Sequence, residues 1–230
     1  MYKYELHCHT AKTSACASLS AEDAVALYLA NGYDGIVVTD HFLNGNTTVH
    51  RDLPNGSYEE KIDAYFEGYE EVKAVANGRL KVFSGLEFSY RGTDVLAYGF
   101  DREHLKRCPE IPTMPMRDFI EYCKSCGVFA VQAHPFREGS WIDHIRLFPG
   151  SEAVEVRNAT CDERCNMLGR AYAEAYQKIR TGGSDLHHAN QRMLSGMAFD
   201  ERADSLEELI ELIKSGRGEV IYQPNLYQKP

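Results

Sequence analysis

Short apolar runs alternate with amphipathic helical patterns along the whole chain, and this alternation limits the fold more than any other feature. The run from Gly35 to Thr39 is almost wholly apolar, as expected of a strand buried on both faces. After Ser20, apolar residues recur on one helical face until Gly32, which predicts a helix with a capping residue at each end. Repeated strand–helix units predict an α/β fold with a mainly parallel sheet.

The rest of the chain follows the same pattern. Further strands are expected at 4–9, 80–86, 95–100, 128–133, 153–156, 181–184 and 220–222. Further helices are expected at about 58–77, 116–127, 161–179 and 205–216, the last beginning with a capping box of Ser205 and Glu208. No repeat, low-complexity segment or linker interrupts these units, so we expect a single domain over residues 1–230.

Charge and composition exclude several classes of protein. The 230 residues include 34 acidic and 25 basic side chains, a formal net charge of −9, which argues against binding to extended nucleic acid but allows a small phosphorylated substrate. No apolar run is as long as the ~18 residues that a membrane-spanning helix needs. The first strand begins almost at Met1 and the seven cysteines form no disulfide framework, which favours a cytoplasmic protein without a signal peptide. Nothing in the sequence indicates an oligomeric state.

Histidine and carboxylate side chains gather at the ends of the expected strands. His7 and His9 end the first strand, and their spacing of two puts both side chains on one face. In a β/α barrel the strand ends open onto one rim, where active sites are built. The other residues of this kind at strand ends are His41, Glu87, His134, Asp185 and His187.

Any one of these residues is weak evidence, but seven on one rim would repel one another or need partners unless a cation lay among them. Neutral imidazole and carboxylate are the protein ligands of zinc, manganese and iron. The combined pattern therefore predicts a metal site, and it leaves the identity of the metal open.

With this series of motifs the sequence resembles the PHP family, the polymerase and histidinol phosphatase domain. The matching segments occur in the family's order over nearly the whole chain: His7-Cys8-His9-Thr10, Thr39-Asp40-His41, Gly85-Leu86-Glu87, His134-Pro135 and Gly183-Ser184-Asp185-Leu186-His187. The resemblance implies a single distorted (β/α)7 barrel, similar to a TIM barrel, that carries two or three divalent ions of manganese, iron or zinc. It also implies a hydrolase acting on phosphoric ester bonds, most often a phosphatase.

The resemblance further implies a ligand set, residue by residue. The first metal ion would be held by His7, His9, Glu87 and Asp185, the second by the bridging Glu87 and by His134, and the third by His41 and His187. Two positions depart from the family pattern, because Ala15 and Leu96 stand where a third-site and a second-site ligand are often found. We therefore expect the second and third sites each to lack one protein ligand.

A mechanism follows from electrostatics. Two cations that share a water molecule lower its pKa towards neutrality, so a hydroxide that bridges the metal ions is the expected nucleophile. His41 or His187 is the expected proton donor to the leaving group. A phosphate dianion usually meets a guanidinium, and Arg137 and Arg157 lie close enough to the rim motifs to bind it. The expected catalytic residues are Asp185, His187, His41 and Glu87.

Three functions are compatible with these residues. The first is hydrolysis of a small phosphomonoester, of the histidinol phosphate or nucleotide type known in the family. The second is cleavage of short nucleic acids by the same site, as an exonuclease or phosphodiesterase. The third is a non-catalytic, metal-stabilised binding module, which only the two missing ligands support.

Overall fold

The protein is described by a computed structural model that covers residues 1–142 and 145–228. Its strands form one nine-stranded sheet in the order β7-β6-β5-β4-β3-β2-β1-β8-β9. The strands are β1 (Tyr2–Cys8), β2 (Gly35–Val38), β3 (Lys81–Tyr90), β4 (Thr93–Tyr98), β5 (Phe129–Gln132), β6 (Ala153–Asn158), β7 (Ile179–Gly183), β8 (Met193–Phe199) and β9 (Glu219–Pro224).

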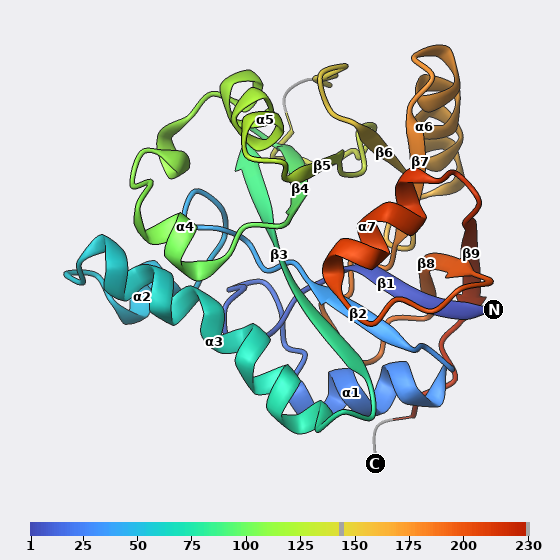
Figure 1. Ribbon diagram of the computed structural model, residues 1–230, viewed down its shortest axis with the longest axis horizontal. Helices are drawn as coiled ribbons and strands as arrows, with labels where there is room; N and C mark the ends of the chain where they lie inside the picture. Colours follow the sequence, from blue (N-terminus) through green and yellow to red (C-terminus); the bar gives the residue numbers. More distant parts are fainter. Residues whose placement is uncertain (143–144, 229–230) are drawn as a thin grey trace.

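Helices surround this sheet, with α1 and α3 below β1 and β2, and α5 and α6 at its upper edge in Figure 1. The helices are α1 (Ala21–Ala30), α2 (Val49–Asp52), α3 (Tyr58–Ala76), α4 (Arg102–Lys106), α5 (Met116–Ser125), α6 (Glu163–Ala175) and α7 (Leu206–Lys214), with a short 3-10 helix at Ile111–Thr113. Ser20 caps α1 as expected, because its side chain accepts a hydrogen bond from the Asp23 amide. None of the helices in the described part of the chain is long and apolar enough to cross a membrane.

The sheet curls into a nearly closed barrel. β1, β2 and β3 run parallel, as do β5, β6 and β7. Beyond the end of β7, Leu186 pairs in parallel with Cys8, the last residue of β1, so the two sides of the sheet meet at the carboxyl ends of the strands. The α/β class and the barrel-like sheet predicted from the sequence are therefore confirmed.

The structure differs from the expected seven-strand parallel barrel in strand direction and number. β4 runs antiparallel to both neighbours, because a two-residue turn at Arg91 and Gly92, both with positive φ, joins it to β3 as a hairpin. β8, which the sequence pattern did not predict, pairs antiparallel with β1 and β9. Gly196 interrupts its apolar pattern, and a Cβ there would overlap the carbonyl oxygen of Tyr4.

Helix α6 is also shorter than predicted. It occupies Glu163–Ala175, while Ile179 already belongs to β7. The barrel interior beneath the strand ends is filled by large side chains, among them Tyr4, Leu96 and Phe129. This packed interior supports the strand ends from below, so that the polar residues of the motifs are held at the rim.

Candidate metal centre

The carboxyl ends of β1, β3 and β7 bring four buried side chains together. His7 Nε2 lies 3.3 Å from Glu87 Oε1 and 3.5 Å from Asp185 Oδ1. His9 Nε2 lies 3.4 Å from Glu87 Oε2 and 3.3 Å from Asp185 Oδ1. Each of the four residues is at most 1% exposed. Two imidazole nitrogens and two buried carboxylates that face one another are the arrangement expected around a cation.

Glu87 lies at the middle of a larger group. His134 Nε2 is 3.4 Å from its Oε1, and His41 Nδ1 is 2.7 Å from its Oε2. Burial alone would raise the pKa of Glu87, but the charges of His41 and His7 hold that pKa well below its usual value. The carboxylate is therefore ionised. His187 completes the group, with its ring stacked on His9 at a centroid distance of 4.1 Å.

Buried polar atoms that lack a hydrogen bond indicate, independently of the sequence motifs, that these residues fit divalent metal ions. The Nε2 of His134 and Oε2 of Glu87 are buried and make no aligned hydrogen bond in the described part of the chain, although His41 Nδ1 lies 2.7 Å from that Oε2, and such atoms are rare in protein interiors. A cation would satisfy both atoms. Four sets of ligand atoms lie within 4.8 Å of one another: His7, His9 and Glu87; His7, His134 and Asp185; Glu87, Asp94 and His134; and His9, His41 and His187.

A second layer of side chains orients the imidazoles. His7 Nδ1 lies 3.0 Å from Glu155 Oε1, and His9 Nδ1 lies 3.0 Å from Ser14 Oγ. These partners engage Nδ1 and leave Nε2 facing the cluster, as in metal sites whose histidines are held by a hydrogen bond on the far side of the ring. The hydroxyl of Ser14 in turn donates to Asp40 Oδ1 at 2.6 Å. The sequence analysis did not assign Glu155 or Ser14 to the site.

Two candidate ligands have strained backbone conformations. His134 has a φ of 25° and Asp185 a φ of 51°, both in the left-handed region that favours glycine. Such a conformation costs about 1–3 kcal/mol and persists only where the surroundings hold it. Glu155 Oε2 accepts the His134 amide at 3.0 Å, and Asp185 Oδ2 accepts the Asn158 side chain at 3.2 Å. Local strain of this kind is typical of functional sites.

A cavity of about 830 Å³ opens above the cluster, and Arg137, Trp141 and His187 are among the residues that line it. Arg137 forms an ion pair with Asp185 Oδ2 and a hydrogen bond with Thr160. The structure thus places this expected phosphate-binding residue beside a candidate metal ligand. Trp141 is 72% exposed at the cavity wall.

A thiol lies next to the position where the sequence lacks a third-site ligand. Cys16, the residue after Ala15, lines the same cavity as His41 and His187. Burial alone would raise the pKa of this thiol, but the two imidazoles lower it to about 6. A sulfur atom is therefore present beside the histidine group, one residue later in the chain than the family pattern places a ligand.

The position expected to hold a second-site ligand on β4 is also shifted. Leu96 pairs directly with Glu87 and packs into the barrel interior, whereas Asp94 pairs with Ser89, one step nearer the rim. Residues directly opposite in an antiparallel pair point to the same face, so Asp94 lies on the face of Glu87. Its Oδ2 is 3.9 Å from His134 Nε2. Asp94 was not expected as a ligand, because Leu96 stands at the place that the family pattern gives.

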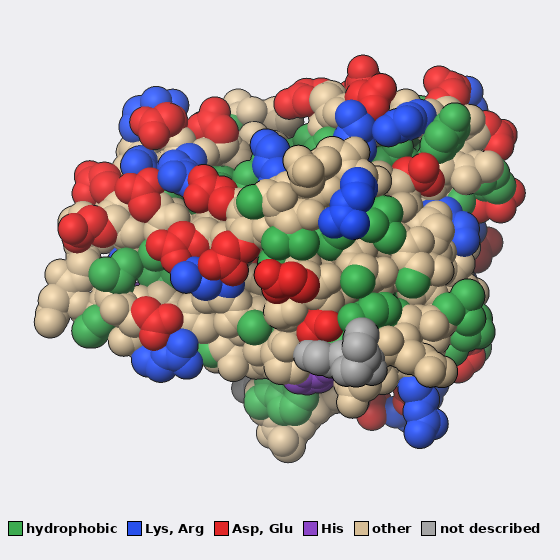
Figure 2. Space-filling model, turned by 90° about the horizontal axis from the view of Figure 1, so that it is seen from below, with side chains coloured by type: hydrophobic (Ala, Val, Ile, Leu, Met, Phe, Trp, Pro, Cys, Tyr) green, Lys and Arg blue, Asp and Glu red, His purple; other side chains and the backbone are tan. Residues whose placement is uncertain are grey.

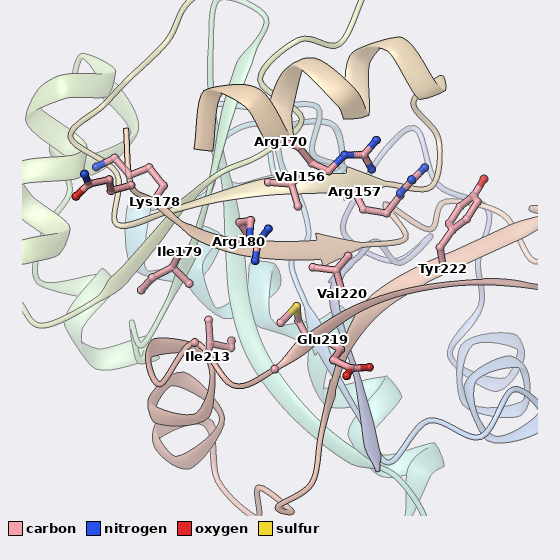
Figure 3. A pocket seen from close by; sticks show the side chains of 14 residues that line it. Val156, Arg157, Arg170, Lys178, Ile179, Arg180, Ile213, Glu219, Val220 and Tyr222 are labelled. Atoms are coloured by element: carbon pink, nitrogen blue, oxygen red, sulfur yellow. The ribbon is translucent and has the colours of Figure 1, made fainter. Parts of the chain in front are cut away.

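Arg157 is not brought to the metal cluster. A bulge in β6 sets Glu155 opposite Thr181 and Arg157 opposite Gly182, so two residues of β6 are matched by one of β7. The bulge turns Arg157 away from the face of Glu155. Its side chain lines a different cavity, which Figure 3 shows between β6, β7 and β9.

Comparisons with known proteins support the fold. No family model matches the sequence, and no curated protein matches it. Among solved structures, a two-domain protein from Bacteroides vulgatus that contains a predicted PHP-like metal-dependent phosphoesterase has a TM-score of 0.68 at 16% identity. The match covers 96% of this chain and 64% of that one, so the chain spans less than two thirds of that protein.

Two further structures share the fold. A protein from Bifidobacterium adolescentis, inferred to be a metal-dependent phosphoesterase, has a TM-score of 0.59 at 13% identity, with 93% of this chain and 96% of that chain covered. The lesion-specific endonuclease PfuEndoQ from Pyrococcus furiosus has a TM-score of 0.56 at 13% identity, with 95% of this chain and 57% of that chain covered. The chain therefore has the fold of PHP-like proteins, as its motifs predicted.

Proposed function

We propose that this protein is a metal-dependent phosphoesterase of the PHP type, a hydrolase whose centre lies at the carboxyl ends of the barrel strands. The observation that carries the proposal is the environment of Glu87. This one buried carboxylate lies within 3.4 Å of four imidazoles, those of His7, His9, His41 and His134. A carboxylate so placed is suited to lie between two cations.

The residues offer places for two or three divalent ions. We assign His7, His9, Glu87 and Asp185 to the first ion, Glu87, His134 and Asp94 to the second, and His41 and His187 to the third. Manganese, iron and zinc all accept such ligands. When bound, the ions would lower the pKa of water towards neutrality and neutralise charge on the phosphate.

Side chains at the cavity supply the remaining chemistry. A guanidinium has five N–H donors, so Arg137 can hold Asp185 and still donate to a phosphate oxygen. Burial alone would lower the pKa of His187, but its hydrogen bond with Cys16 and the charge of Asp185 raise that pKa above the ordinary value. With no ion in the third set, this environment favours the protonated imidazole, and His187 can then donate a proton to the leaving group.

The preferred substrate is a small phosphomonoester. The cavity volume of about 830 Å³ is that of a small-molecule site, which typically measures ~300–1,000 Å³. Arg137 is the single Arg or Lys among the described residues that line this cavity, and the face in Figure 2 mixes acidic and basic side chains without a continuous basic stripe. The fold of PfuEndoQ is the observation that favours the alternative, cleavage of short nucleic acids.

Phosphate release from a panel of small phosphomonoesters, measured with added Mn²⁺, tests this proposal. We expect release that EDTA abolishes and that Asp185→Asn lowers by at least 100-fold, because this variant loses a charge on the first metal set. The matched control is Asp200→Asn, which removes an exposed carboxylate outside the cavity. Cleavage of short oligonucleotides without phosphomonoester hydrolysis would favour the nuclease. Bound metal without hydrolysis of either substrate would favour the binding module.

A further inference from the structure

A second cavity lies where the two edges of the sheet, β7 and β9, face each other without pairing. It has a volume of about 760 Å³, and its walls come from β6 to β9 and from the flanking helices α6 and α7 (Figure 3). We call it the seam cavity. None of the four metal-ligand sets found in the described part of the chain includes a residue that lines it. It is therefore separate from the proposed catalytic centre.

The fold itself creates this opening. At Gly182 the two edges touch, since a Cβ there would lie 2.7 Å from Val220 Cγ1 and 2.9 Å from the Gly196 carbonyl oxygen. Two residues earlier along β7, at Arg180, the edges have separated and the cavity begins. The seam is thus a wedge, closed by a glycine at one end and open at the other.

The charge of the seam cavity opposes that of the whole protein. Among the described residues that line the cavity Glu219 is the single acidic one, whereas the chain as a whole carries a net charge of −9. A local cluster of cations on an acidic protein concentrates anions at that place. The lining cations are Arg157, Arg170, Lys178 and Arg180.

Carboxylates neutralise only part of this charge. Arg157 and Arg170 share Glu163, at 2.6 Å and 2.5 Å. Lys178 Nζ donates to the carbonyl oxygen of Ser151 at 2.7 Å, so its charge has no carboxylate partner there. The side chain of Arg180 makes no hydrogen bond or ion pair with the described residues, and it lies between the other cations in Figure 3. Two positive charges therefore face the cavity without a counter-ion from the protein.

We propose that the seam cavity binds a small anion that carries several phosphate groups, with Arg180 and Lys178 as its principal contacts. Guanidinium groups match the geometry of phosphate oxygens. The ring of Tyr222, which is 47% exposed and lies 4.6 Å below the Arg157 guanidinium, forms one wall. The volume of the seam cavity is enough for such a ligand but not for an extended polymer.

The seam cavity is linked to the metal centre through two strands. β7 lines the cavity with Ile179 and Arg180 and leads at its other end to Asp185. In β6 the cavity residues Val156 and Arg157 lie between Glu155 and Asn158. Arg157 is followed by Asn158, whose side chain donates to Glu155 Oε2 at 2.9 Å and to Asp185 Oδ2 at 3.2 Å. An anion that moves Arg157 thus acts on the hydrogen bonds that orient two residues of the metal centre.

Calorimetric titration of the metal-free protein with inorganic tripolyphosphate tests this inference. Arg180→Gln is the main variant, because Arg180 has no contact that the fold needs, and Lys178→Gln is the second. Arg137→Gln reports binding in the other cavity, and Arg117→Gln, an exposed arginine on α5 that lines neither cavity, is the matched control. We expect either seam variant to weaken binding at least tenfold and Arg117→Gln to leave it unchanged.

Three results would overturn the inference: no binding by the wild type, binding that Arg137→Gln removes and Arg180→Gln does not, and equal affinity for citrate. The first two would leave the seam without a ligand, and the third would exclude a preference for phosphate. Circular dichroism confirms folding of each variant. The metal content of Arg180→Gln should equal that of the wild type, so this test is independent of the proposed phosphoesterase activity.

Discussion

Replacing Glu155 by glutamine should weaken metal binding although Glu155 is not itself a candidate ligand. Its Oε1 lies 3.0 Å from His7 Nδ1, while its Oε2 accepts the His134 amide at 3.0 Å and the Asn158 side chain at 2.9 Å. Glutamine keeps the shape of the side chain but replaces one oxygen by an NH₂ group. Whichever way the amide is oriented, one side of this arrangement loses its acceptor.

The two orientations have different consequences. With NH₂ towards His7, Nδ1 must accept, so Nε2 carries the proton and cannot bind a metal ion. With NH₂ towards His134, two donors face an NH₂ group, and the strained His134 backbone loses its acceptor. Loss of a residue that orients a metal-bound histidine typically costs 10- to 100-fold in metal affinity, about 1.4–2.7 kcal/mol.

The assay is calorimetric titration of the metal-free protein with Mn²⁺, with metal content after dialysis as a second readout. Glu174→Gln, which replaces another exposed carboxylate on α6, is the matched control. We expect a 10- to 100-fold weaker affinity for Glu155→Gln and no change for Glu174→Gln. An unchanged affinity in a folded Glu155→Gln protein would refute the argument that Glu155 fixes the tautomer of His7.

Three further predictions follow from the same geometry. Asp94→Asn should bind one Mn²⁺ ion fewer than the wild type in an electron paramagnetic resonance titration, and an equal count would exclude Asp94 as a ligand. Gly183→Ala should lower the free energy of unfolding in urea by about 1–3 kcal/mol, because its Cβ would overlap Glu155 Oε1 and lie 2.5 Å from His7 Cβ; Gly150→Ala, whose Cβ meets nothing nearer than 3.4 Å, should change it little. Burial alone would lower the pKa of His41, but Glu87 raises it to about 11, so this ion pair stabilises the metal-free fold fully below pH ~6.5 and is lost as the pH rises through the folded pKa. A metal ion that binds His41 at pH 8 must then displace the proton of this imidazole. The buffer takes up that proton, so the apparent binding enthalpy should differ between Tris and HEPES, and equal values would contradict this.

The position of the candidate site was predictable because strand ends are easy to find in a sequence. His7, His9, Glu87 and Asp185 each follow or end an apolar run, and a barrel brings such ends together whatever the details of its strands. The direction of β4 was not predictable from apolar patterning, since the pattern is the same for parallel and antiparallel strands. The two-residue turn at Arg91 and Gly92 determines the direction of β4, because it makes β3 and β4 a hairpin.

The residues that the sequence analysis missed depend on register and on bulges. Asp94 lies two residues before Leu96, on the same face of β4 and nearer the rim. Only the pairing of β3 with β4 reveals which of the two lies at the rim. The bulge in β6 likewise turns Arg157 from the expected rim into the seam cavity. Glu155 was missed because it lies within an apolar strand and contacts His7, which is 148 residues away in the sequence.

Anomalous diffraction from crystals grown with Mn²⁺ would test the central claim most directly. The account predicts a manganese peak among His7, His9, Glu87 and Asp185, and a second peak on the other side of Glu87, beside His134 and Asp94. Crystals with well-ordered side chains at the barrel rim but no manganese peak beside Glu87 would contradict it.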